Sequence, residues 1–589
     1  MSTNLEHYAM IGDGQTVALV SKHGSIDWFC WPRFDSDACF AALLGTKSHG
    51  HWGIAPVGEA AVRQYYREDT LILETEYTSG SGTVRLTDFM PQRGENAAII
   101  RRVTGVTGQV ELRSALLVRS NYGALAPWFE PIEGGFAGRI GSGVFALRAD
   151  VEVRNEDQDL CATFTVAEGE CVTFVLGVGA TSSPVPPPVD AEQALDETER
   201  FWRDWIGKFD KPCDWTADVK RSLITLKALI FQPTGGMVAA PTTSLPEKPG
   251  GALNWDYRFS WIRDASFTLA ALLNAGFKPE AEAWRDWVLQ ALGAWPEEMR
   301  IMYRVDGSRH IPESEVEWLP GYNHSKPIHI GNAASTQHQA DVYGELLDAM
   351  HLADQAGIKR TRQSLVIEAR IAAHIEKSWT QPGAGLWEAR GRPRHYVYSR
   401  AMAWVGIDRF LKSEELCDYV GAETVACYKA LRDEIHADVC REGYHEGLGR
   451  FVEYFGGQTL DACLLLLPLV GFLPADDPRM AATITAIETE LMQDGMVRRK
   501  PAQGMEPQGS FIACTLWLAD CQNLQGRTAE ARATLERVLA VASETGLLSE
   551  EYNVPGQHLA GNYPQALSHL AVVNTALGLC GPVLQRGGG

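Results

Sequence analysis

A chain of 589 residues is long enough for two or more domains, and a hydrophobic content of 45% is sufficient to bury large cores. The formal net charge of −21 argues against nucleic acid or an anionic membrane as a partner. No apolar run approaches the roughly 18 residues of a membrane-spanning helix, and the start lacks the basic and apolar regions of a signal peptide. We therefore expect a cytoplasmic protein, with a homo-oligomer left open.

The twelve cysteines are scattered through apolar segments, and none belongs to a CxxC pair. This pattern indicates reduced core residues rather than a disulfide framework or a zinc site. We expect no metal and no cofactor.

The first part of the chain is predicted to be β structure. Apolar and polar residues alternate in TLILETEYTSGSGTVRLTDF, where Ser79–Gly82 is predicted to be a hairpin turn, and again in GQVELRSALLV and GVFALRADVEV. Many short strands separated by glycine turns favour an antiparallel β-sandwich over residues 1–182. The proline-rich SSPVPPP then opens a linker with a connecting helix, predicted over 183–214.

From residue 215 to residue 589 the hydrophobic period becomes 3.6, which is typical of helices. We expect twelve of them, near 216–231, 263–275, 279–293, 336–355, 362–379, 395–411, 421–440, 459–470, 478–494, 510–524, 528–545 and 564–579. The even-numbered helices are more apolar and follow long loops rich in aromatic and charged residues. This alternation predicts an (α/α)6 barrel with six inner helices, whose N-terminal loops gather at one mouth.

The segment NWDYRFSWIRDASFTLAALLNAGF, residues 254–277, crowds aromatic side chains around charges and then becomes an almost wholly apolar helix. A helix that is apolar on every side is buried on every side, so its N-terminal end opens inside the protein. Gly276 is predicted to end this helix. Fixed charges framed by Trp and Tyr suit a sugar, although a buried Arg–Asp pair that simply closes a helix end explains the same residues.

The long loops carry candidate catalytic and binding residues. Glu388 and Trp387 precede the sixth helix, and Glu550 and Glu551 precede the twelfth. Further candidates for substrate binding lie ahead of the fourth and tenth helices: Trp318, Tyr322, His324 and Arg499. Two carboxylates that converge on an aromatic cavity meet the needs of glycoside hydrolysis, in which one donates a proton and the other activates water or attacks directly.

The chain resembles the bacterial branch of glycoside hydrolase family 15, which comprises glucoamylases, trehalases and related exo-α-glucosidases. The resemblance is carried by IGDGQTVALVSKHGSIDWFCWPRFDS, VAAPTTSLPE, YRFSWIRDASFTLAAL, LWEARGRPRHYVYS and GLLSEEYNVPGQHLAGNYPQALSH, in that order along nearly the whole chain. It implies a β-sandwich followed by an (α/α)6 barrel, and hydrolysis with inversion that releases β-glucose from a non-reducing end.

The resemblance also implies residue roles. The Glu of the LWE motif, Glu388, would be the general acid, and the first Glu of the SEE motif, Glu550, would be the general base, with Glu551 left open as the alternative. The WxRD motif supplies further candidates that would bind or enclose the sugar: Trp261, Arg263 and Asp264, with Tyr257 and Trp387 as walls and Arg499 as an additional sugar-binding residue.

One position departs from the glucoamylase pattern, since Ala389 stands where a second acidic residue usually follows the acid. The sequence therefore favours a small α-glucoside, trehalose first, over starch, with isomaltose or short malto-oligosaccharides as alternatives. An inverting phosphorylase shares the barrel but replaces the base by a phosphate site, which the Glu at position 550 argues against. A non-catalytic sugar-binding protein would not need both carboxylates.

The N-terminal segment SIDWFCWPRFDS carries aromatic residues on both faces, unlike a strand buried on one side only. Two interpretations remain open. Either the segment packs against the barrel as a domain interface, or its tip, with Arg33 and Asp35, borders the subsite of the leaving sugar.

Overall fold

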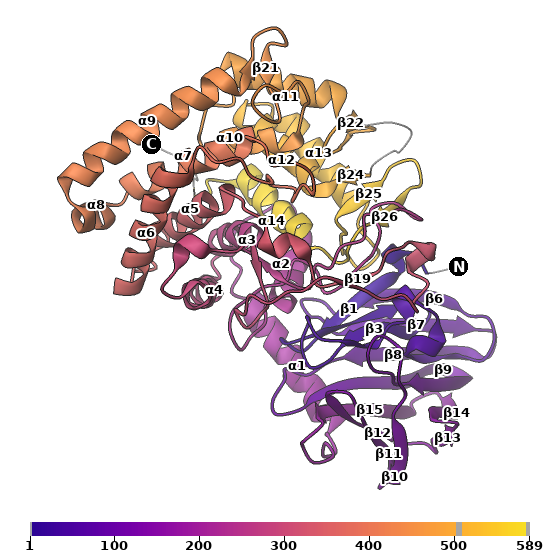
Figure 1. The fold of residues 1–589 in the computed structure, drawn as a ribbon. Helices are drawn as coiled ribbons and strands as arrows, with labels where there is room; N and C mark the ends of the chain where they lie inside the picture. The colour runs from indigo at the N-terminus through magenta and orange to yellow at the C-terminus, as the bar shows by residue number, and fades with distance from the viewer. Residues whose placement is uncertain (1–2, 502–508, 585–589) are drawn as a thin grey trace.

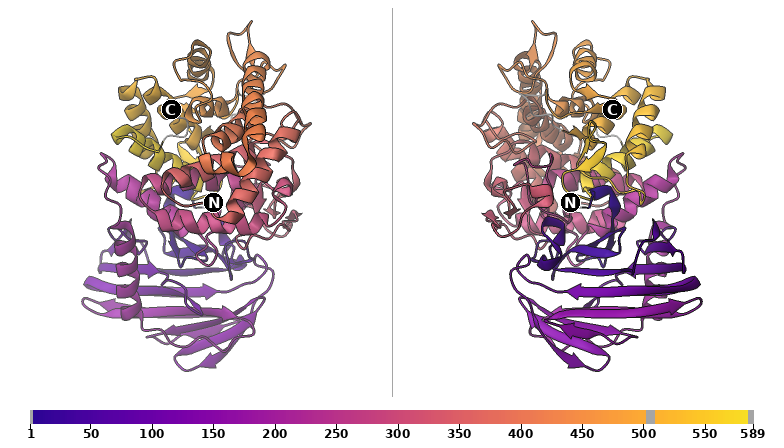
Figure 2. Two further views of the ribbon diagram at one scale, coloured as in Figure 1. Left: turned by 90° about the vertical axis from the view of Figure 1, so that its left-hand side faces the viewer. Right: turned by 90° about the vertical axis from the view of Figure 1, so that its right-hand side faces the viewer.

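The computed structural model describes residues 3–501 and 509–584, and its strands and helices separate along the chain (Figure 1). An antiparallel sheet domain comes first, and a helical domain follows it. In the two side views the sheet domain lies beneath the helical domain, and α1 runs along its flank (Figure 2). Within the described residues, no helix is long and apolar enough to cross a bilayer.

Fifteen strands form the N-terminal domain: β1 (Tyr8–Gly12), β2 (Val17–Ser21), β3 (Ser25–Cys30), β4 (Ala38–Phe40), β5 (His51–Pro56), β6 (Ala61–Tyr66), β7 (Leu73–Ser79), β8 (Gly82–Phe89), β9 (Ala97–Leu117), β10 (Trp128–Ile132), β11 (Gly135–Ile140), β12 (Gly143–Ala149), β13 (Arg154–Glu156), β14 (Asp159–Ala167) and β15 (Cys171–Ala180). The long strand β9 pairs with β5 and β14 through its second half and with β8 and β15 through its first. It thereby belongs to both layers of the domain. The predicted hairpin is confirmed, because β7 and β8 pair across the turn from Ser79 to Gly82.

The strands β1, β2 and β3 contribute to two hydrophobic cores at once. On β3, Trp28 packs in the core of the helical domain, whereas its neighbour Phe29 packs between the layers of the sheet domain. The same alternation places Met10 with the helices and Ile11 with the sheet. Because both faces of β3 are buried, the strand can carry aromatic side chains on both faces, and this explains the pattern seen in the sequence.

All twelve expected barrel helices are present. The outer ones are α2 (Thr216–Ala228), α4 (Lys278–Leu292), α6 (Arg362–Ser378), α9 (Ala422–Glu442), α11 (Pro478–Glu490) and α13 (Thr528–Ala540). The inner ones are α3 (Ile262–Asn274), α5 (Asp341–Gln355), α7 (Val397–Leu411), α10 (Leu466–Leu469) with the 3-10 turn Ala462–Leu465, α12 (Ile512–Leu524) and α14 (Ala566–Cys580). Contacts from α3 to α5, α7, α10, α12, α14 and back to α3 close the inner ring.

Two further helices complete the chain, α1 (Ala191–Ile206) in the predicted linker and the short α8 (Glu414–Val420). Short strands in the loops are β16 (Ser260–Trp261), β17 (Met302–Tyr303), β18 (Ser314–Glu315), β19 (His329–Ile330), β20 (Tyr444–His445), β21 (Arg450–Phe451), β22 (Met492–Gln493), β23 (Met496–Val497), β24 (Ser510–Phe511), β25 (Glu551–Asn553) and β26 (His558–Ala560).

The ends of the helices follow local chemistry. Gly276 stands just after α3 with a φ of +92°, a conformation that costs glycine little, and so confirms the predicted end. At the start of α11 the Asp477 side chain accepts the N–H of Arg479 next to Pro478. The eighth helix is shorter than predicted. Its Pro468 lacks the N–H for an α-helical bond, and a 3-10 turn precedes it.

Charged side chains tie the two domains together. Arg258, in the segment ahead of α3, is fully buried and pairs with Asp256 at 2.7 Å. Its other N–H groups donate to the Ser36 carbonyl and the Tyr122 hydroxyl of the sheet domain at 2.7 and 2.8 Å. The guanidinium therefore bridges the two domains from a buried position.

Arg33 and Asp35 also face the helical domain. Arg33 pairs with Asp306 at 2.6 Å, and Asp35 pairs with Arg304 at 2.8 Å, so both reach the turn after β17. These contacts favour the domain-interface interpretation of the segment SIDWFCWPRFDS.

We expect Arg258→Met to lower the free energy of unfolding by about 3–5 kcal/mol, because it leaves Asp256 buried without its partner. Arg33→Ala, which removes a more exposed ion pair of the same interface, should cost about 1 kcal/mol or less. Urea denaturation of both variants measures the difference. Equal losses would show that Arg258 does not anchor the interface.

Candidate active site

One short segment at the start of α3 donates hydrogen bonds to both predicted catalytic carboxylates. The Tyr257 hydroxyl donates to Glu550 Oε1 at 2.6 Å. A few residues further on, Trp261 Nε1 and Arg263 Nη1 donate to Glu388 Oε1 at 3.2 and 3.0 Å. The structure thus brings Glu388 and Glu550, from loops far apart in the sequence, to the two ends of one segment.

Glu388 lies on the loop between α6 and α7 with a φ of +49°, which is uncommon for a residue other than glycine. The backbone is held there by two contacts: its N–H donates to the Gly385 carbonyl at 3.2 Å, and the Gln337 side chain donates to its carbonyl at 3.2 Å. Burial raises the pKa of the Glu388 carboxyl to about 7, while Arg263 opposes the shift. The carboxyl is therefore mostly protonated below neutral pH and loses its proton as the pH rises through about 7.

Acidic side chains surround Arg263. Its Nε donates to Asp264 Oδ1 at 2.7 Å, and its Nη1 donates to the Leu386 carbonyl at 2.5 Å. Behind it on α5 lie Asp341 and Glu345, both buried, and burial is the main cause that raises their pKa values. A single guanidinium is thus the positive charge for several carboxylates on this side of the site.

A second guanidinium, that of Arg499, lies among the carboxylates on the side of the site where Glu550 is found. Arg499 Nη2 pairs with Glu247 and lies 3.3 Å from Glu551 Oε1. Burial first, and then the charge of Glu247, raise the pKa values of Glu550 and Glu551, whereas Arg499 lowers them. The Tyr257 hydroxyl bond favours the ionised form of Glu550 in particular.

Aromatic rings form a wall beside these charges. Trp387 Nε1 donates to Asp461 Oδ1 at 2.9 Å, and its ring lies 5.1 Å from Phe511 and 6.1 Å from Trp517, centroid to centroid. The Arg499 guanidinium lies 5.6 Å from the centroid of the Trp387 ring. Hydrogen bonding and stacking together fix the indole, so its orientation is set before any ligand binds.

A second aromatic group lies near the rim. Trp255 stacks on His329 at 5.3 Å, and the Arg390 guanidinium lies 4.5 Å from the Trp255 centroid. Arg390 is in turn paired with Glu313 at 2.8 Å. Arg390 follows Glu388 by two residues, so this group is connected directly to the loop that carries Glu388.

Three predicted binding residues lie elsewhere. Trp318 donates through Nε1 to the Tyr122 carbonyl at 3.1 Å, and the Tyr322 hydroxyl donates to the Thr3 carbonyl at 2.9 Å. His324 is exposed on the same loop. The loop ahead of the fourth helix therefore packs Trp318 and Tyr322 against the sheet domain, and the structure does not bring them to the carboxylates.

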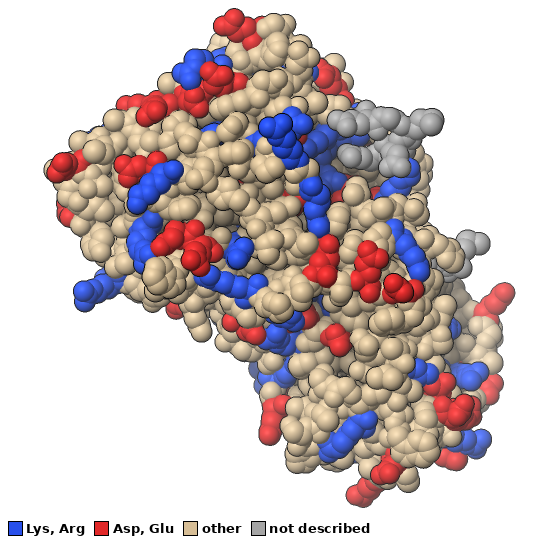
Figure 3. Space-filling view, viewed as in Figure 1, with Lys and Arg blue, Asp and Glu red and all other residues tan. Residues whose placement is uncertain are grey.

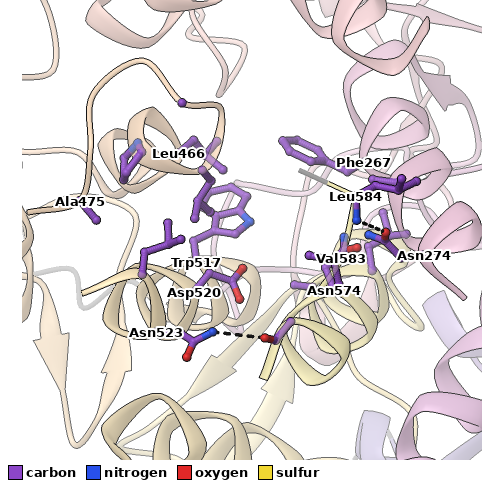
Figure 4. Close-up of a pocket in the computed structure, with 18 of the residues that line it drawn as sticks. Phe267, Asn274, Leu466, Ala475, Trp517, Asp520, Asn523, Asn574, Val583 and Leu584 are labelled. Atoms are coloured by element: carbon purple, nitrogen blue, oxygen red, sulfur yellow. Dashed lines mark hydrogen bonds between the residues drawn. The ribbon is translucent and has the colours of Figure 1, made fainter. Parts of the chain in front are cut away.

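A cavity of about 650 Å³ opens among the inner helices, but it does not contain the carboxylates. Figure 4 shows its wall, which includes Phe267 and Asn274 of α3, Trp517 and Asn523 of α12, and Asn574 of α14. These residues lie toward the C-terminal ends of α3 and α12, whereas the catalytic candidates lie at their N-terminal ends. Trp517 separates the two regions, since it also contacts Trp387.

Sequence reasoning missed four buried acids of the site: Glu247, Asp341, Glu345 and Asp461. Asp461 alone leaves a signal, as an N-cap ahead of the apolar LLLL run, and its side chain does accept the Cys463 N–H. Asp341 and Glu345 look like ordinary polar residues in the sequence, because burial depends on packing from distant segments. Glu247 ends the motif VAAPTTSLPE, but the motif does not indicate its role. Within the described residues, no group of three His, Cys, Asp or Glu side chains could hold a metal ion.

A closed ring of inner helices with paired buried carboxylates and aromatic walls defines a carbohydrate-active (α/α)6 barrel enzyme. A family model described as glycosyl hydrolases family 15 matches residues 217–577, and one described as trehalase-like, N-terminal matches residues 1–202. The chain belongs to glycosyl hydrolase family 15 and is a glycoside hydrolase.

Similar proteins cover nearly the whole chain. It is 33% identical to a trehalase of Thermoplasma volcanium over 99% of this chain and 94% of that protein. It is 34% identical to a trehalase of Mycobacterium tuberculosis over 97% of this chain and 88% of that protein. A solved bacterial glucoamylase in complex with acarbose has a TM-score of 0.73 at 12% identity, covering 98% and 94% of the two chains, and confirms the fold.

Gly561 permits the position of Glu550. Its φ is +76°, and a Cβ there would lie 2.7 Å from Glu550 Oε2. We expect Gly561→Ala to displace this carboxylate and lower kcat at least tenfold. Gly526 has the same φ of +76° with nothing within 4 Å, so Gly526→Ala imposes the same backbone strain, ~1 kcal/mol, without touching the site. If both variants kept full activity per folded molecule, the close packing against Glu550 would be irrelevant to turnover.

Proposed function

We propose that this enzyme hydrolyses trehalose with inversion, with Glu388 as general acid and Glu550 as general base. The observation that carries the proposal is that one segment fixes both carboxylates, through Tyr257 on one and Trp261 with Arg263 on the other. The substrate is proposed from the trehalases that match the chain over nearly its full length. Isomaltose hydrolysis is the weaker alternative, because the isomaltose glucohydrolase of Kribbella flavida is 25% identical over 54% of this chain.

The acid step requires a protonated carboxyl near the glycosidic oxygen. Glu388 fits this role because burial holds its pKa at about 7, above the usual range of a glutamate. Its proton passes to the bridging oxygen as the bond to the anomeric carbon breaks. Arg263 and Trp261 then stabilise the carboxylate that remains, since both donate to its Oε1.

The base step requires an ionised carboxylate on the opposite face of the sugar. Glu550 accepts the proton of a water whose oxygen bonds to the anomeric carbon, so one glucose leaves as the β-anomer. The other glucose keeps its α configuration, because its own anomeric bonds are not broken. The hydrogen bond from the Tyr257 hydroxyl favours the ionised form of Glu550.

The remaining candidates suit sugar binding. We infer that Arg263 and Asp264 bind hydroxyls of the ring that is attacked, with Trp387 as a wall. Asp264 Oδ2 is buried and has no hydrogen-bond partner among the described residues, which leaves it available to accept from a hydroxyl. Trp255 and Arg390 offer a stacking face and a charge to the second ring near the rim.

A cytoplasmic location is part of the same proposal. All twelve cysteines are free thiols, which suits a reducing compartment. Acidic and basic side chains are mixed in small groups on the face shown in Figure 3, without a broad basic area.

Trehalose offers a direct test of inversion, because each turnover should release one β-glucose and one α-glucose. Proton NMR of the anomeric signals before mutarotation measures this ratio, and in ¹⁸O-labelled water the label should enter the β-anomer only. Two α-anomers would indicate retention. Isomaltose, kojibiose, nigerose and maltose serve as comparison substrates, and faster glucose release from any of them would replace trehalose as the substrate.

The raised pKa of Glu388 predicts a limb in the pH profile. For trehalose, kcat/KM should fall as the pH rises through about 7, because the protonated acid is lost. For α-glucosyl fluoride this limb should be absent, since fluoride leaves with little protonic help. Glu388→Gln should accordingly lose several orders of magnitude on trehalose and much less on the fluoride. An identical alkaline limb on both substrates would contradict the acid role.

A further inference from the structure

We propose that Glu247 is a positioning residue for hydrolysis, which holds Arg499 beside the base and sets how strongly Glu550 attracts a proton. The inference rests on the proposed role of Glu550 as base. The sequence motifs indicate roles for Glu388 and Glu550, whereas Glu247, the last residue of the motif VAAPTTSLPE, receives a role only from its contacts in the packed structure.

Glu247 is tied to the Glu550 loop through the backbone as well as by charge. It lies on the loop between α2 and α3, and its side chain is buried. The carbonyl of the preceding residue, Pro246, accepts the N–H of Gly561 at 2.9 Å. Gly561 is the residue at which an added Cβ would lie 2.7 Å from Glu550 Oε2. A displacement of Glu247 would therefore reach Glu550 along two independent routes.

Arg499 is the group on which Glu247 acts directly. Its Nη2 pairs with Glu247 and approaches Glu551 Oε1 at 3.3 Å. The guanidinium lies beside two aromatic rings that contact each other, 5.6 Å from the centroid of Trp387 and 5.3 Å from that of Phe511. The rings cover one side of the guanidinium, and the ion pair with Glu247 fixes the direction in which its N–H groups point.

The charges that face Glu550 come from four segments. Glu247 and Glu551 repel its negative form, Arg499 and Arg263 attract it, and the Tyr257 hydroxyl donates to it. Among these charges Glu247 is the largest that raises the pKa of Glu550, and Arg499 is the largest that lowers it. By repelling Glu550 and engaging Arg499, Glu247 makes Glu550 a stronger base for water.

Glu247→Gln tests this inference, because the amide oxygen can still accept from Arg499 while the charge is lost. On α-glucosyl fluoride, kcat/KM depends on the base without the acid. We expect its acidic limb to move to lower pH by at least about one unit, since the negative charge that raises the pKa of Glu550 is removed while Arg499 keeps its hydrogen-bond acceptor. The plateau rate should fall, because the base becomes weaker.

Two variants separate this role from a structural one. Glu247→Asp keeps the charge and should keep the acidic limb near the wild-type pH, even with a lower rate. If Glu247→Gln does not fold, Glu247→Asp takes its place as the test. A displaced acidic limb in Glu247→Asp would then overturn the inference. Glu368→Gln is the matched control: Glu368 of α6 is also buried and paired with an arginine, Arg360, at 3.1 Å, but on the outer ring. It should leave both limbs unchanged.

Glu550→Gln distinguishes a failure of the proposed base from a failure of the positioning role of Glu247. If it stays active, the proposed base is wrong. If it is inactive while Glu247→Gln has an unmoved acidic limb, the base stands and the role of Glu247 fails. A loss in Glu247→Gln as deep as that in Glu550→Gln at every pH would also overturn the positioning role, since Glu247 would then be required for the chemistry itself.

Discussion

Buried carboxylates outnumber buried guanidinium groups around the site, and this imbalance governs its chemistry. Arg263 serves Asp264, Glu388 and the α5 acids, and Arg499 serves the acids near Glu550. Removing a carboxylate from water without a full counter-charge raises its pKa, so some of these groups keep a proton at neutral pH. A glycoside hydrolase needs this state for its acid and must prevent it for its base. Burial and the charge of Glu247 raise the pKa of Glu550 to about 8, and the hydrogen bond from Tyr257 acts in the opposite direction, toward the ionised form.

Such a cluster is tolerated only where surrounding packing holds it. The closed inner ring supplies one part of this packing, and the sheet domain supplies another. The strands β1 to β3 place alternate side chains in the helical core, and Arg258 joins the domains close to the segment that binds both carboxylates. The sheet domain is therefore part of the support of the site, since the residues ahead of α3 are fixed from both sides.

The periodic features of this fold could be predicted from the sequence. The twelve helices, the cap at Asp477 and the glycine after α3 depend on local residues, and local residues are what a sequence displays. Glu388 and Glu550 could be predicted as catalytic candidates because each sits in a distinctive motif. The double burial of β3, the role of Glu247 and the turning of Tyr322 toward the sheet domain could not be predicted in this way. Each depends on which distant segment packs opposite, and no local pattern encodes that choice.

The same charge imbalance bears on the choice of nucleophile. A phosphorylase must bring a phosphate ion to the face of the sugar where water would otherwise attack. With Glu550 as the proposed base, that face is bordered by Glu550, Glu551 and Glu247, and Arg499 is already engaged by Glu247 and Glu551. An anion would add to the uncompensated negative charge, whereas water adds none and gives up a proton that Glu550 can accept. The arrangement of charges therefore favours hydrolysis over phosphorolysis, independently of any motif in the sequence.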